Sequence, residues 1–301
     1  VYKRQLPTLM AIMSTPSWSG DGTTLGGSSW TGFTKSRQCF EPLLPGSLFA
    51  PPARCNECDL GLELSTCGLA CRTAMEKMVE WEDPESIAAI IMDPLPGSNI
   101  GYPLPPEGYL QGVRDLCAKH GNVLVFDEVQ TGIGRLGTFY GYQHYGVEPD
   151  IITLAKGLGG GVPIGATLFK EHACTLRPGD HGNTFGGNPL MCVAAQVVVE
   201  HVLHTGFLDT VIAKGKRIRA GLEELRSTGK VVEVRGTGLL NGVELNSAET
   251  ADMVVNKARE RGLIVVKANA TTVRLVPALN VEDEEIELAL TTIGSVLAES
   301  G

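Results

Sequence analysis

The sequence predicts a two-domain α/β protein, in which a mostly parallel sheet sandwiched by helices is followed by a smaller α+β domain. Two observations support this class. Up to about residue 205, short apolar runs rich in β-branched residues alternate with helical segments, as in βαβ units. From about residue 228 the pattern changes to paired strands between helices. We therefore expect a large domain over residues 1–205 and a small domain over residues 206–301.

The bulk composition is that of an ordinary globular protein. Of the 301 residues, 43% are hydrophobic and 20% are charged, and the formal net charge is −9. A negative charge of this size argues against a nucleic-acid surface or a basic membrane-binding patch. No apolar run approaches the roughly 20 residues that span a bilayer. We expect a cytoplasmic protein with neither nucleic acid nor membrane as a partner.

The large domain is expected to contain several buried strands and two long helices. Residues 1–13 lead into no regular element, which indicates either a fragment or a first dozen residues that are not native. Residues 17–50, rich in Gly, Ser and Thr, are expected to form loops and short strands. Apolar runs predict strands at 87–92, 123–126, 151–154 and 164–169. Periodicity predicts helices at 105–121 and 188–203. Gly121 is expected to end the first of them.

The small domain begins with an amphipathic helix over residues 207–227. A hairpin is predicted over residues 230–245, followed by a helix and a strand within 250–266. A short strand at 273–279 and a closing helix at 281–299 complete the domain.

Two charged residues follow neighbouring predicted strands. Asp127 ends the run Val-Leu-Val-Phe, and Lys156 follows Ile151–Leu154 and precedes several glycines. The carboxyl ends of parallel strands meet at one edge of a sheet, where ligands bind. A lysine there can form a Schiff base with an aldehyde, and an aspartate can keep a pyridine nitrogen protonated, which is the chemistry of pyridoxal phosphate. The alternative is that Asp127 caps a helix and Lys156 is a surface charge.

The segment "VLVFDEVQTGIGRLGTFYGYQHYGVEPDIITLAKGLGGGVPIGA" closely resembles the signature of the class III, pyridoxal-phosphate-dependent aminotransferases of fold type I. The similarity runs from about Trp18 to the C-terminus and is densest between residues 93 and 190. The resemblance implies transamination between an amino donor and a 2-oxo acid, with pyridoxal 5′-phosphate as the cofactor.

The resemblance also implies roles for individual residues in the cofactor site. Lys156 matches the lysine that forms the internal aldimine and later moves the proton from Cα. Asp127 matches the partner of the pyridinium nitrogen. Val129 matches the apolar residue on one face of the ring, and Gln130 matches the side chain that hydrogen-bonds the ring hydroxyl.

Two further matches concern the partner subunit and the substrate. Thr184 matches a threonine that reaches the cofactor phosphate of the neighbouring subunit, which implies a homodimer. Arg274 matches the arginine that grips the substrate carboxylate, a task that suits its planar fork; the alternative is a surface charge on a strand. Arg235, in "VRGTG", matches a turn of the small domain and is expected to be structural.

The sequence departs from the family pattern in the stretch "SWSGDGTTLGG". Trp18 is a candidate for the aromatic residue stacked on the ring, but Asp21-Gly22 aligns equally with the family's His-Gly, which would place Gly22 in the cofactor site. Family members carry roughly a hundred or more residues before this region, including a loop that cradles the phosphate at a helix N-terminus. We therefore expect an N-terminally truncated member that binds cofactor weakly or not at all alone.

The sequence leaves open the identity of the amino donor and the type of reaction. "GDHGNTFGGNPL" looks most like the ornithine and acetylornithine branch, whereas residues 96–117 look more like branches that use 4-aminobutyrate or β-alanine, which we favour slightly. Ser98 lies near the position where ornithine and 4-aminobutyrate enzymes have a glutamate. This serine and the "SW…G" stretch resemble 2,2-dialkylglycine decarboxylase, so decarboxylation or racemisation is an alternative. A further alternative is a non-catalytic fragment with zinc at Cys55, Cys58, Cys67 and Cys71.

Overall fold

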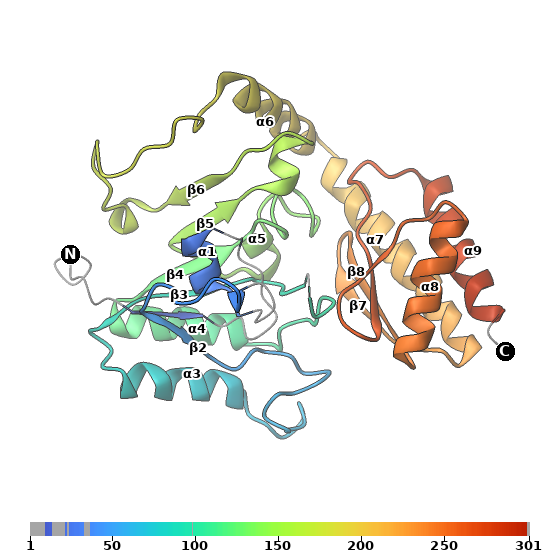
Figure 1. The fold of residues 1–301 in the computed structure, drawn as a ribbon, viewed down its shortest axis with the longest axis horizontal. Coiled ribbons are helices and arrows are strands. Elements are labelled where there is room, and N and C mark those ends of the chain that lie inside the picture. Colours follow the sequence, from blue (N-terminus) through green and yellow to red (C-terminus); the bar gives the residue numbers. More distant parts are fainter. Residues whose placement is uncertain (1–9, 14–21, 23, 33–36, 98, 300–301) are drawn as a thin grey trace.

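The computed structural model describes residues 10–13, 22, 24–32, 37–97 and 99–299. These residues form two sheets, one of six strands and one of four, each flanked by helices (Figure 1). The hydrophobic cluster of the second sheet begins with Phe207 and Val211, next to the predicted domain boundary.

The first sheet has the strand order β2-β1-β3-β4-β5-β6. All neighbours are parallel except β6, which runs antiparallel to β5 at one edge. The prediction of a mostly parallel sheet is therefore correct. The strands are β1 (Met10–Met13), β2 (Ser47–Phe49), β3 (Ile87–Met92), β4 (Val123–Asp127), β5 (Ile151–Leu154) and β6 (Ala166–Phe169).

The apolar run in β4 is explained by burial on two faces. Leu124 and Phe126 pack into a cluster with the helices α3 (Ala70–Trp81) and α4 (Tyr109–His120). Val123 and Val125, which alternate with them, belong to a different cluster. A strand with apolar neighbours on both faces needs no alternation of polar residues, which is why this run is continuous.

Helix α4 shows how local sequence sets an element. Its predicted apolar stripe is confirmed, since Tyr109, Val113, Leu116 and Cys117 are all buried. Gly121 ends the helix in the left-handed conformation (φ 71°), a backbone state that costs glycine little. The helix begins after the predicted prolines rather than at them.

Three further helices complete the large part of the chain and lead into the small one. They are α1 (Leu25–Trp30), α5 (Gly141–Tyr145) and α6 (Pro189–Val202). Helix α6 packs near the end of β5, where Ala195 and Val202 join Leu154 and Leu158 in one cluster. Among the described residues, no single helix is long and apolar enough to cross a membrane. Helix α6 and the helical segment Phe207–Thr228 taken together have the length and composition of a membrane span, but a bend of 75° separates them.

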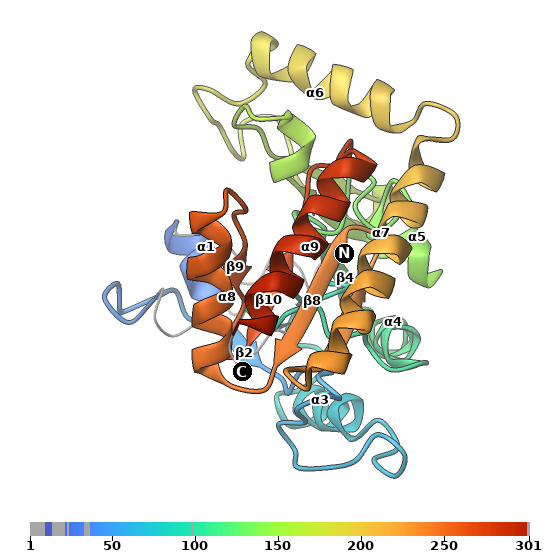
Figure 2. The ribbon, with the colours of Figure 1, turned by 90° about the vertical axis from the view of Figure 1, so that its right-hand side faces the viewer.

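The second sheet is antiparallel, with the order β7-β8-β10-β9. Its strands are β7 (Val231–Thr237), β8 (Leu240–Leu245), β9 (Val266–Lys267) and β10 (Thr272–Leu275). The helices α7 (Phe207–Glu224), α8 (Ala248–Glu260) and α9 (Asp283–Ala298) lie on the face turned away from the first sheet (Figure 2). Their buried residues share one cluster with those of the strands, so this part has its own core.

Two predictions near the N-terminus are wrong. Residues 10–13 form β1, paired between β2 and β3, although an irregular segment was expected there. Residues 25–30 form α1 instead of loop or strand, because the Thr24 side chain accepts a hydrogen bond from Gly27 N (3.2 Å) and caps the helix.

Asp150, the residue directly before β5, connects β4 and β5 through its side chain. Its side chain is 6% exposed and accepts hydrogen bonds from Leu124 N (2.8 Å) and Arg114 Nη1 (2.8 Å). Burial alone would raise the pKa of this carboxyl group, but the bonds from Leu124 and Arg114 outweigh burial and hold the pKa below its ordinary value. The ionised carboxylate therefore contributes to stability at neutral pH.

Replacing Asp150 by Ala is expected to lower the free energy of unfolding at pH 7 by about 3 kcal/mol, because Arg114 loses its buried partner. The contribution is present above the pKa of the unfolded chain, about 3.9, and is lost as pH falls through the lower folded pKa. Urea unfolding at several pH values measures both effects.

The matched control for this measurement is Glu148→Ala. Glu148 pairs with Lys170 at 3.4 Å, but 62% of its side chain is exposed. Such a surface pair contributes under about 1 kcal/mol. Equal losses in the two variants would contradict the assigned role of Asp150.

Candidate active site

Asp127 and Lys156 lie at the same edge of the first sheet. Asp127 is the last residue of β4 and stands opposite Thr153 of β5 in the parallel register. Lys156 follows Thr153 by three residues and begins a short 3₁₀ turn, Lys156–Gly159. The structure thus brings the two predicted catalytic side chains to neighbouring strand ends.

The Asp127 carboxylate is half-buried and weakly solvated. It accepts a hydrogen bond from Val129 N (2.9 Å). Burial raises the pKa of Asp127, while the Val129 N–H and the positive charge of Lys156 act in the opposite direction. A cation placed near Asp127 would therefore be stabilised.

Lys156 has an unusual backbone. Its φ is 44°, in the left-handed region that non-glycine residues seldom adopt. Its side chain is exposed, and no hydrogen bond or salt bridge with the residues that the structure describes holds the amine. Strained residues of this kind cluster at functional sites, and a free amine at a strand end is available for chemistry.

Glu128, the second acid after the strand, points elsewhere. It is 1% exposed and accepts hydrogen bonds from Gly141 N (2.5 Å) and Tyr142 N (2.7 Å) at the start of α5. Burial raises the pKa of Glu128 to about 7 despite these two bonds. Because adjacent residues at a strand end point to opposite faces, Asp127 is left for the ligand edge while Glu128 anchors α5. The sequence analysis assigned no role to Glu128, although strand alternation was the signal for it.

The residues after Asp127 connect the site to the small domain. Val129 is half-buried beside Asp127, and Gln130 Nε2 donates a hydrogen bond to the hydroxyl group of Tyr102 (2.9 Å). The Tyr102 side chain packs in one cluster with Leu240 of β8. The sequence analysis did not identify Tyr102, because nothing in its local pattern marks it.

Arg274 lies on β10, opposite Gly242 of β8 and Val266 of β9. Its side chain is half-buried, and its Nε atom is buried with no hydrogen-bond partner among the described residues. A guanidinium with an unsatisfied buried nitrogen has free capacity to bind a carboxylate.

The remaining predicted residues lie apart from this group or outside the described residues. Thr184 is exposed on the turn that precedes α6, and its predicted reach into a neighbouring subunit stays a prediction. Gly22 is exposed with φ 103°, and a Cβ added there would touch nothing within 4 Å, so no observation links it to the cofactor site. Trp18 lies outside the described residues.

The four clustered cysteines line one small cavity of about 20 Å³. Cys55, Cys58, Cys67 and Cys71 are all free thiols. Within the part of the chain that the structure describes, no three His, Cys, Asp or Glu side chains converge to hold a metal ion. The zinc alternative therefore finds no support in the geometry.

Comparison with known proteins identifies the family. The family model for the class-III aminotransferases matches residues 10–297, and this match includes the β1 residues, whose native origin the sequence analysis left open. Acetylornithine aminotransferase of Caldanaerobacter subterraneus subsp. tengcongensis is 42% identical over 279 residues, which are 92% of this chain and 65% of that protein. The enzyme of the same name from Thermosynechococcus vestitus is 41% identical over 293 residues, 95% of this chain and 67% of that protein. The chain thus spans about two thirds of the length of these relatives.

Solved structures agree with the fold class. An amine transaminase from an uncultivated Pseudomonas species, in its pyridoxal-phosphate-bound form, superposes with a TM-score of 0.90 at 27% identity, over 100% of this chain and 72% of that one. A Bacillus anthracis aminotransferase gives 0.87 at 29% identity, over 99% and 71%. These neighbours have fold type I, as predicted. Both the family model and the structural neighbours place this chain among the class III, pyridoxal-phosphate-dependent aminotransferases.

Proposed function

We propose that this chain carries the catalytic centre of an aminotransferase that moves the ω-amino group of an amino acid of the N-acetylornithine type to a 2-oxo acid. One observation carries the proposal. A half-buried carboxylate, Asp127, and a free amine, Lys156, lie at the ends of two adjacent parallel strands.

The residues suit pyridoxal phosphate. When bound, the cofactor supplies an aldehyde that condenses with amines and a pyridinium ring that accepts an electron pair. Burial raises the pKa of Asp127, so a protonated ring nitrogen beside it would stabilise the ionised carboxylate. The Gln130 side-chain amide, which donates a hydrogen bond to the Tyr102 hydroxyl group, would be the group that binds the ring hydroxyl.

Different side chains carry out proton transfer and substrate binding. Lys156 Nζ removes the proton from Cα of the bound donor and returns one, which calls for an exposed amine on a short tether. Asp127 keeps a proton on the ring nitrogen. Arg274 offers its buried, unpaired Nε and its terminal nitrogens to the substrate carboxylate.

The choice of donor rests on the relatives. The proteins that match at about 40% identity carry the name acetylornithine aminotransferase, and a structural neighbour is an ornithine aminotransferase from Toxoplasma gondii (28% identity, TM-score 0.82, over 99% of this chain and 67% of that one). This favours the acetylornithine branch over the 4-aminobutyrate and β-alanine branches that residues 96–117 suggested.

A donor panel tests the proposal. N-acetylornithine, ornithine, 4-aminobutyrate and β-alanine are each supplied with 2-oxoglutarate or pyruvate, and amino-acid products are measured. N-acetylornithine with 2-oxoglutarate is expected to turn over fastest. Carbon dioxide from 2-aminoisobutyrate, or racemisation without an oxo-acid acceptor, would replace the proposal by one of the alternative activities.

Replacing Lys156 by Ala is expected to abolish borohydride-fixed attachment of pyridoxal phosphate at this position and to lower turnover by about 10³-fold, because the base for the Cα proton is lost. Peptide mass analysis after reduction measures attachment. Lys170→Ala, which removes a surface lysine next to β6, is the control and should retain both properties. Attachment that persists in Lys156→Ala would refute the role.

Replacing Asp127 by Asn is expected to leave cofactor attachment to Lys156 intact while turnover falls by about 10²- to 10³-fold, since a neutral amide does not hold the ring proton. Stopped-flow measurement of Cα proton removal tests this expectation. Asp115→Asn, on the exposed side of α4, is the control. A rate close to that of the unsubstituted chain would count against Asp127.

A further inference from the structure

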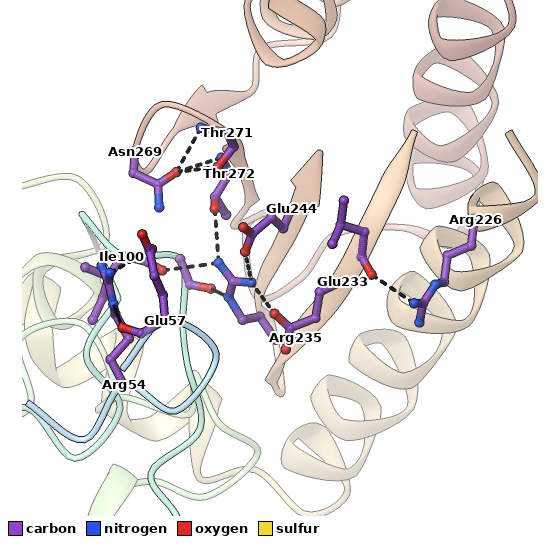
Figure 3. Close-up of polar contacts among 12 residues, drawn as sticks. Arg54, Glu57, Ile100, Arg226, Glu233, Arg235, Glu244, Asn269, Thr271 and Thr272 are labelled. Carbon is purple, nitrogen blue, oxygen red and sulfur yellow. Dashed lines mark hydrogen bonds and ion pairs between the residues drawn. The ribbon is translucent and has the colours of Figure 1, made fainter. Parts of the chain in front are cut away.

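Arg235 and Arg135 each donate a hydrogen bond across the contact between the large and the small part of the chain. Arg235 of β7 is 5% exposed and forms ion pairs with Glu233 (2.7 Å) and Glu244 (2.5 Å) of its own sheet (Figure 3). Its Nε donates to the carbonyl oxygen of Gly101 (2.8 Å) in the large part. Arg135 makes the reverse connection, from the large part to the small one.

Arg135 belongs to the loop that connects β4 to α5, and this loop also contains Val129 and Gln130. Its Nη1 donates a hydrogen bond to the carbonyl oxygen of Pro277 (2.5 Å). Its own carbonyl oxygen accepts a hydrogen bond from Leu239 N (3.0 Å), in the turn between β7 and β8. The loop that follows Asp127 is therefore bonded to the small part through both the side chain and the backbone of Arg135.

The carbonyl oxygen that Arg135 binds lies on the segment that leaves β10. This strand ends at Leu275 and carries Arg274, and Pro277 follows shortly after it. Arg274 and Pro277 also line one cavity of about 480 Å³. A shift of Pro277 relative to the loop would therefore also move Arg274 relative to Gln130.

The loop has little freedom to move against the small part. A Cβ added to Gly238 would lie 2.3 Å from the Arg135 carbonyl oxygen. A Cβ added to Gly137 would lie 2.3 Å from Cγ1 of Ile212 in α7. No further side-chain atom fits at either position, so close packing supports the hydrogen bond between Arg135 and Pro277.

The surroundings of Arg135 strengthen this hydrogen bond. The side chain is half-buried, and burial lowers the pKa of its guanidinium group. Within the part of the chain that the structure describes, no carboxylate forms an ion pair with it. The Pro277 carbonyl oxygen is thus the acceptor for a poorly solvated charge, and hydrogen bonds with a charged donor are stronger than those between neutral groups.

We propose that Arg135 is a positioning residue, whose bond to Pro277 fixes Arg274 relative to residues 127–130 and thereby sets the affinity for the substrate carboxylate. This inference rests on the proposed function for the role of Arg274. Arg135 acts through Arg274 and exchanges no proton with the substrate. Its loss is therefore expected to weaken binding more than it slows the chemical step.

The test compares Arg135→Met with Arg219→Met. Arg219 of α7 is also half-buried, and its Nη1 donates to a backbone carbonyl oxygen, that of Gly238 (3.0 Å), but both groups belong to the small part. Arg135→Met is expected to raise KM for carboxylate-bearing donors about tenfold, with kcat changed less than twofold, because a hydrogen bond from a charged group is lost. Arg219→Met should leave KM unchanged.

Two further measurements show that the effect concerns the carboxylate. KM for an amine without a carboxylate should not change in Arg135→Met. Arg135→Gln, which also removes the charge but keeps a polar side chain, should give the same rise in KM for carboxylate-bearing donors, and it replaces Arg135→Met if that variant does not fold.

A binding measurement separates this inference from the activity. Calorimetry with 2-oxoglutarate and no cofactor should show about tenfold weaker binding in Arg135→Met and none of that loss in Arg219→Met. In an Arg274→Ala background, Arg135→Met should add no further loss, because Arg135 acts through Arg274.

Three results would overturn the inference. The first is a further loss from Arg135→Met in the Arg274→Ala background, which would make Arg135 itself a carboxylate ligand. The others are an equal loss in Arg219→Met, or no carboxylate binding by the unsubstituted chain. A chain that binds 2-oxoglutarate as expected but neither attaches pyridoxal phosphate nor transfers an amino group would instead refute the proposed function alone.

Discussion

The parallel pairing of β4 with β5 is the constraint on which the rest of the site depends. Because the two strands run in the same direction, their carboxyl ends share one edge, and the register sets Asp127 opposite Thr153 with Lys156 just beyond. The apolar residues of β4 are anchored in two separate clusters, so the strand cannot slide to expose its terminal carboxylate. Burial makes that carboxylate unfavourable as an isolated anion, and a nearby cation then becomes the natural partner.

A second constraint is the contact between the two sheets, where Arg235 of β7 donates a hydrogen bond to the Gly101 carbonyl oxygen. Arg235 would be costly to bury alone, but its two glutamates and the Gly101 carbonyl oxygen satisfy it. The position of Arg274 relative to β4 is therefore set by side-chain contacts between the sheets as well as by the covalent chain. This matters for the proposed function, because Arg274 and Asp127 come from different sheets and have to face one substrate.

Periodicity predicted the central strands and the long helices well, because each of these elements buries a regular apolar pattern. It failed where an element depends on distant partners. Met10–Met13 has only one β-branched residue, so its local pattern does not mark a strand, and it exists because β2 and β3 pair with both of its edges. The segment Leu25–Trp30 has weak helix propensity, and the Thr24 cap supports it.

The sequence by itself determined the family, and it predicted the central strands, the long helices and the placement of Asp127 and Lys156 at neighbouring strand ends, since these follow from residue type, spacing and a long shared motif. Only the tertiary structure decided that Arg235 donates a hydrogen bond to the Gly101 carbonyl oxygen, and that Tyr102 packs with Leu240. The reason is physical: strand alternation and local propensity act over a few residues. Contacts between residues more than a hundred positions apart depend on how two sheets dock, which no local pattern encodes.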